Sequence, residues 1–114
     1  MTMDTFTDAQ MMRLARMTKA KILEVLNVYS IRDCLLFHRR LTESIVGFSK
    51  RNKHLLTLQW ELVCIAEMVR RMAYRAIYDD FKIQIKLKYP QITDPQLKAL
   101  TKEKTEKIIK KYSY

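Results

Sequence analysis

Apolar residues recur every three or four positions along much of this chain, which is the spacing of one face of an α-helix. The longest such run spans residues 55–88 and carries two apolar stripes about half a turn apart. The first comprises Leu55, Leu58, Leu62, Ile65, Val69, Met72, Ala76, Ile83 and Leu87. The second comprises Leu56, Trp60, Val63, Tyr74, Tyr78, Phe81 and Ile85. Because a surface helix needs one apolar face, we expect neighbours on both sides: the monomer core on the first stripe and a second copy on the second.

Capping signals predict two helices before this one. The first, residues 7–27, begins with a capping box in which Thr7 is followed three positions later by Gln10. The second, residues 30–49, begins at Ser30, with a carboxylate in its first turn that suits the helix dipole.

The remaining segments flank or join these helices. Residues 49–54 are polar and basic, and they form a connector of ordinary length for a helical bundle. Residues 1–6 are expected to be a flexible tail. Residues 93–114 are predicted to be a peripheral basic C-terminal helix, which begins at Thr93 and runs to about Lys111, because a capping residue there precedes a proline at the first helical position.

Residues 81–89 carry a competing signal, since apolar and polar side chains alternate there as in a half-buried strand. A lone strand needs a mate, and its copy across a dimer two-fold would supply one. Both apolar stripes of residues 55–88 continue through the segment in register, however, which favours a helix.

Composition supports an all-α fold. The chain has only one glycine and two prolines among 114 residues. Folds with many strands and tight turns usually contain more of these two residue types. We therefore predict one domain over residues 1–114, a small helical bundle of about four helices whose long third helix spans residues 55–88 and which dimerisation would complete.

A formal net charge of +10 narrows the class of partner. Such an excess favours nucleic acid, an acidic protein surface or an anionic membrane surface. A membrane surface is the weakest of these, because the polar face of residues 7–27 holds little net positive charge. The sequence shows no signal-peptide pattern and no apolar run that spans a bilayer, so a cytoplasmic location is expected, or a nuclear one in a eukaryote.

Residue types that perform catalysis are sparse. His38 and His54 lack a nucleophile or metal-ligand motif beside them, and Cys34 and Cys64 form no paired spacing. Cys34 lies on an apolar stripe, which predicts a buried thiol. We expect a protein that is not an enzyme, with no cofactor, no metal and no small-molecule substrate.

The first functional hypothesis is a small non-catalytic protein that binds nucleic acid in a regulatory role. Positive charge is densest over residues 31–56. Phosphate contacts are expected there, and they favour backbone binding over the reading of bases. The predicted nucleic-acid-binding residues are Arg39, Arg40, Lys50, Arg51, Lys53 and His54.

The alternative hypothesis is a protein-binding adaptor or inhibitor, of phage or mobile-element type, that docks on an acidic surface of a larger protein complex. Tryptophan, tyrosine and arginine commonly anchor protein interfaces. The predicted interface residues are Trp60, Val63, Arg70, Arg71, Tyr74, Tyr78 and Phe81, and the same face is where a homodimer would form.

Overall fold

The computed structural model describes residues 5–112, which fold into five helices. These are α1 (Asp8–Arg16), α2 (Lys19–Leu26), α3 (Ile31–Arg51), α4 (Leu56–Lys88) and α5 (Asp94–Tyr112). No strand occurs within that range, so the all-α bundle with a long central helix is confirmed. The strand alternative for residues 81–89 is wrong, because α4 stays helical to Lys88.

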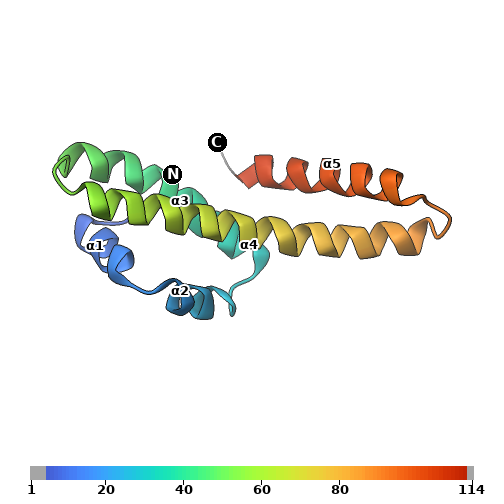
Figure 1. The fold of residues 1–114 in the computed structure, drawn as a ribbon, viewed down its shortest axis with the longest axis horizontal. Coiled ribbons are helices and arrows are strands. Elements are labelled where there is room, and N and C mark those ends of the chain that lie inside the picture. The colour runs from blue at the N-terminus through green and yellow to red at the C-terminus, as the bar shows by residue number, and fades with distance from the viewer. Residues whose placement is uncertain (1–4, 113–114) are drawn as a thin grey trace.

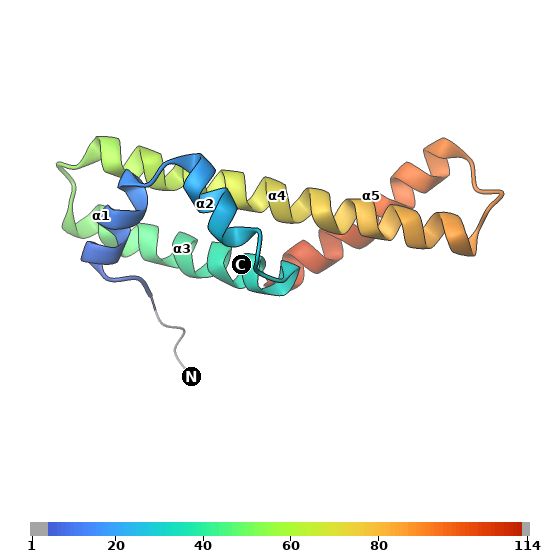
Figure 2. The ribbon, with the colours of Figure 1, turned by 90° about the horizontal axis from the view of Figure 1, so that it is seen from below.

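The helices form three layers (Figure 1). The antiparallel pair α3–α4 is the middle layer, with α1 and α2 below it and α5 above it. The view from below shows α1 and α2 in front of the pair and α5 crossing behind α4 (Figure 2). Because α5 lies along the C-terminal half of α4, the molecule is elongated, with extents of 55 × 30 × 24 Å.

The segment predicted as one helix over residues 7–27 is two helices. Met17 adopts an extended conformation with φ −72° and ψ 147°. The hydroxyl of Thr18 accepts a hydrogen bond from the Lys21 backbone N–H at 3.2 Å, which caps α2. A threonine side chain that bonds to nearby backbone competes with helix continuation, so the capping residue ends one helix and starts the next.

The main core lies between α1, α3 and α4, with contributions from α2 and from Ile109 of α5. Its largest fully buried members are Met11, Leu41, Phe48, Leu62, Ile65 and Val69. Aliphatic and aromatic side chains from three helices therefore meet at the end of the molecule where the α3–α4 turn lies.

Phe6 belongs to this packed region. Its backbone N–H donates to the hydroxyl of Ser44 at 2.9 Å, and that hydroxyl donates to the Arg40 carbonyl at 2.7 Å. The ring of Phe6 meets that of Phe37 edge-on, with centroids 5.6 Å apart. Phe6, the last residue of the predicted tail over residues 1–6, thus packs on the fold, while residues 1–4 lie outside the described part of the chain.

The buried face of α4 turns around the helix axis from one half to the other. In the N-terminal half Leu62 and Val69 are buried, as the first stripe predicts. In the C-terminal half Ile85 of the second stripe is buried instead, while Ile83 and Leu87 of the first stripe are 61% and 77% exposed. The cause is the offset of the neighbours, because α1 and α3 pack on one half of α4 and α5 packs on the other.

The ion pair between Asp8 of α1 and Arg51 of α3 supports a prediction about acid stability. Arg51 Nη2 donates to Asp8 Oδ1 at 2.6 Å, and the Asn52 side chain donates to Oδ2 at 3.2 Å. These hydrogen bonds, Arg51 foremost, lower the pKa of Asp8 below its ordinary value. The ionised carboxylate therefore stabilises the fold above about pH 4, and this contribution is lost as the pH falls through the lower pKa of the folded state.

We expect Asp8→Asn to lower the urea unfolding midpoint at neutral pH and to match the parent protein in acid, below the lowered pKa of Asp8. Glu24→Gln, which removes an exposed carboxylate paired with Lys21 within α2, is the matched control and should track the parent at both pH values. A difference between Asp8→Asn and the parent that persisted unchanged in acid would contradict the assigned role of the pair.

Candidate binding surfaces

Two of the groups that sequence analysis considered for catalysis, Cys34 and His38, lie one helical turn apart on α3. The Cys34 thiol is buried and donates to the Leu26 carbonyl at 3.7 Å, and burial raises its pKa. His38 is half-buried between α3 and α4, where burial and then the nearby Arg70 lower its pKa. Across residues 5–112 no cluster of three or more histidine, cysteine or acidic side chains is arranged to hold a metal ion.

Three of the six predicted nucleic-acid-binding residues already make contacts within the chain. Arg51 is held by Asp8, and the guanidinium of Arg40 lies 4.0 Å above the centroid of the Phe6 ring. Arg39 lies 3.6 Å from the carboxylate of Glu43. These contacts hold the side chains against the protein, so a phosphate would compete for each of them.

The other three predicted phosphate contacts lie around the turn between α3 and α4. Lys50, Lys53 and His54 are all exposed there. The structure therefore leaves Lys50, Lys53 and His54 exposed at one end of the molecule, while Arg39, Arg40 and Arg51 are engaged by contacts within the chain.

The predicted interface residues are divided by α5. Trp60 and Val63 remain 68% and 45% exposed on the N-terminal half of α4. Tyr74 and Phe81 are half-buried and pack against the core. Because α5 covers the second stripe in the C-terminal half, part of the face expected to receive a second copy is occupied within the same chain.

A basic stripe that sequence analysis did not single out runs along the exposed side of α4. We define the α4 basic stripe as Arg71, Arg75, Tyr78, Lys82 and Lys86. Their spacing of four, three, four and four residues places them on one helical face, and the four basic residues are exposed. The sequence signal for this stripe is the helical spacing of its members, because they do not form a run of adjacent charges.

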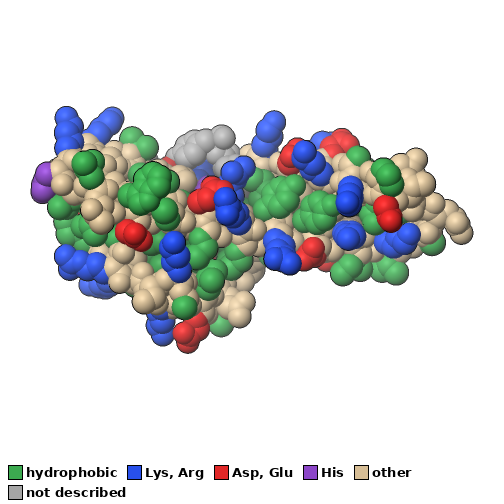
Figure 3. All heavy atoms as spheres, in the orientation of Figure 1, with side chains coloured by type: hydrophobic (Ala, Val, Ile, Leu, Met, Phe, Trp, Pro, Cys, Tyr) green, Lys and Arg blue, Asp and Glu red, His purple; other side chains and the backbone are tan. Residues whose placement is uncertain are grey.

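The α4 basic stripe also carries an aromatic ring and acidic neighbours. Tyr78 stacks on Tyr74, with ring centroids 6.1 Å apart and planes 21° apart. Glu67 accepts from Arg71 at 3.1 Å, and the exposed Asp79 lies at the edge of the stripe. Figure 3 likewise shows lysine and arginine side chains mixed with acidic and hydrophobic ones over α4 and α5. This surface therefore carries both signs of charge.

A groove of about 490 Å³ lies between α3 and α4, and all of its lining residues come from these two helices. We define the α3–α4 groove by its lining residues, His38, Thr42, Ile45, Val63, Ala66, Glu67 and Arg70. Outside this lining set, three large apolar side chains are strongly exposed on α3 and on the N-terminal part of α4. They are Val46 at 58%, Leu56 at 70% and Trp60 at 68%.

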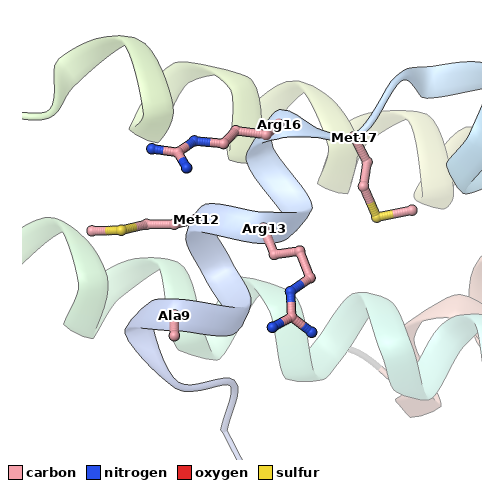
Figure 4. A pocket seen from close by; sticks show the side chains of 5 residues that line it. All are labelled: Ala9, Met12, Arg13, Arg16 and Met17. Carbon is pink, nitrogen blue, oxygen red and sulfur yellow. The ribbon is translucent and has the colours of Figure 1, made fainter.

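A hollow beside α1 does not have polar or charged groups that point toward one common ligand position. It is lined by Ala9, Met12, Arg13, Arg16 and Met17. Figure 4 shows the guanidinium groups of Arg13 and Arg16 pointing in different directions, so they do not meet around one anion. Met12 and Met17 are half-buried and pack against the core, which favours a structural role for these two methionines.

Comparisons with known proteins assign no family to this chain. No protein-family model, curated protein or solved structure matches it. Among the described residues, no helix is both long enough and apolar enough to cross a bilayer.

Proposed function

We propose that this chain is a non-catalytic basic protein that binds nucleic acid through the phosphate backbone, with a regulatory role. The observation that carries the proposal is the α4 basic stripe, in which four exposed cationic side chains share one face of one rigid helix. Counterion release from phosphates supplies most of the affinity of such a surface and needs no particular base sequence.

The geometry of the stripe suits an extended polyanion. Fifteen positions separate Arg71 from Lys86, which corresponds to about 22 Å along an α-helix. Tyr78 lies within this length, and an aromatic ring beside a basic track is a stacking platform for an unpaired base. The exposed Lys50, Lys53 and His54 form a separate, shorter basic site at the α3–α4 turn.

The test is a fluorescence-anisotropy titration of labelled single-stranded and duplex DNA and RNA across a salt series. Four phosphate contacts predict a slope of log affinity against log salt of about −3 for single strands and about −3.6 for a duplex. The double variant Lys82→Ala/Lys86→Ala is expected to weaken binding and to bring the slope to about half, because each lost contact removes about one counterion.

The matched control is Lys98→Ala/Lys102→Ala, which removes the same charge from exposed positions on α5. We expect a much smaller effect, since only the general field of the protein changes. Asp79→Asn should strengthen binding a few fold by removing a repulsive charge beside the stripe. Affinity that does not fall with salt, or equal losses in the two double variants, would refute the proposed site.

One specific observation favours a second candidate function, the binding of another protein as an adaptor or inhibitor. The chain's single tryptophan, Trp60, is largely exposed on α4, three residues before Val63 of the α3–α4 groove. Tryptophan is among the residues that most often dominate the energy of protein interfaces, and exposed apolar patches mark such interfaces. Homodimerisation stays a prediction, which light scattering of the purified chain at several concentrations checks.

A further inference from the structure

The α3–α4 groove continues the surface on which α5 packs. Val63 and Arg70 line the groove, and Ile77 and Phe81 follow them at intervals of seven, seven and four residues. Residues at these intervals share one face of a helix. Ile77 is buried and Phe81 is half-buried in the half of α4 that α5 covers. The same face of α4 is thus covered by a helix in one half and uncovered in the other.

The dimensions of the uncovered half suit another helix. α5 ends above the middle of α4, next to α3 (Figure 1). From there the open face extends from Arg70 back to Leu56, fourteen positions, which is about 21 Å or four helical turns. The two walls, α3 and α4, are the helices that α5 also contacts. A helix laid end to end with α5 therefore meets the same kind of surface.

The charges around the groove indicate which side chains a bound helix would carry on its flanks. Glu67, which lines the groove, is paired with Arg71, and Glu43, next to the lining residue Thr42 on α3, is paired with Arg39. Arg70 is exposed in the groove wall, and the exposed Lys50 follows Val46 by one turn of α3. The apolar floor is consequently bordered by net positive charge.

We propose that the α3–α4 groove binds an amphipathic helix of a partner protein, with apolar side chains on the face that enters the groove and acidic side chains flanking that face. The bound helix buries Trp60, Leu56 and Val63, while its carboxylates meet Arg70 and Lys50. This proposal rests on the second candidate function and names the class of its partner; it is independent of nucleic-acid binding at the α4 basic stripe.

A second copy of this chain fits the groove less well. Each copy carries a formal net charge of +10, which opposes self-association. Glu103 and Glu106 of α5 are interleaved with lysines along that helix and so do not present a purely acidic border.

Trp60 supplies a direct readout. The probe is a synthetic helical peptide of about four turns, without tryptophan, that carries leucines along one face and glutamates on both flanks. We expect a blue shift of tryptophan emission that saturates on titration. A peptide of the same leucine pattern with lysines on the flanks should bind at least about tenfold more weakly, because its charges oppose those of the groove.

Two aspartate variants on α4 locate the site. Val63→Asp places a carboxylate in the groove wall and should weaken binding of the glutamate-flanked peptide at least about tenfold. Ile83→Asp is the matched control, since Ile83 is 61% exposed on α4 away from the groove. It should leave the affinity within about twofold.

Three outcomes would overturn the proposal. One is that the peptide with flanking lysines, or a glutamate peptide whose leucine pattern is scrambled, binds as tightly as the original glutamate-flanked peptide. Another is an emission maximum that is already blue-shifted in the protein alone, with a dimer by light scattering, which would assign the groove to a second copy. The third is a shift that survives Val63→Asp. None of these depends on the DNA or RNA titration, so failure at the groove and failure at the α4 basic stripe are distinguishable.

Discussion

Phe48→Ala is expected to lower the free energy of unfolding by about 3–5 kcal/mol, which is the largest effect we expect from a single truncation. Phe48 is fully buried in the main core between α1, α3 and α4. Its removal forfeits the transfer free energy of a large aromatic side chain and leaves a cavity that the neighbours fill only in part. That loss is a large share of the stability of a domain of this size.

The measurement is urea unfolding followed by far-UV circular dichroism, together with a thermal melt. We expect the melting temperature to fall by more than about 10 °C. Val46→Ala, two positions earlier on α3 and 58% exposed, is the control and should change stability by less than about 0.5 kcal/mol. Similar losses in the two variants would mean that the core does not lie where the structure places it.

Ile85→Asp is expected to release α5 from α4 while the α1–α3–α4 core stays folded. Ile85 is 3% exposed, and it is buried in the half of α4 that α5 covers. Exchanging its apolar side chain for an unpaired carboxylate costs about 4 kcal/mol or more if α5 stays docked, so undocking is the easier response.

Few apolar side chains hold α5 against the rest of the molecule. Its buried face consists of Leu97, Thr101, Thr105 and Ile109. The two threonine hydroxyls are fully buried but donate to the carbonyls one turn earlier, at 2.6 and 2.7 Å, so they are satisfied within α5 and add little apolar area. Hydrogen exchange is expected to show lost protection across α5, with protection in α3 and in the N-terminal half of α4 retained.

The matched control for α5 release is Ile83→Asp, the same substitution two residues away on the same helix. Ile83 is exposed, so protection of α5 should be unchanged. If Ile85→Asp instead unfolded all helices together, the two halves of the molecule would form one cooperative unit, and the independent release of α5 would be refuted.

Local signals predicted the helix starts well. Thr7, Ser30 and Thr93 each cap a helix at the position that the sequence indicates, with side-chain oxygens that accept from the backbone three residues later. Thr18 provides the same kind of signal, but it lies inside an apolar pattern that continues across it. The pattern concealed the break between α1 and α2, because periodicity alone does not distinguish one helix from two that meet at a cap.

The candidate surfaces were harder to predict than the helices. A run of adjacent basic residues, such as Arg39 and Arg40, points in different directions once it is helical, and both side chains are engaged within the fold. The α4 basic stripe is visible in the sequence only at intervals of three and four residues, and of its members only Arg71 stands directly beside another basic residue. Trp60 and Val63 were predicted at an interface and remain exposed, so that part of the hypothesis stays open to the groove experiment.

The sequence by itself determined the all-α class, the long helix α4 and the capped helix starts, because each depends on residues within a few turns of one another. Only the tertiary structure decided which side of α4 is buried at each point. Both apolar stripes are continuous in the sequence, yet Ile85 of the second is buried while Leu87 of the first is exposed. The physical reason is that burial depends on where α1, α3 and α5 dock, and α5 reaches α4 only after the chain has reversed at Pro90.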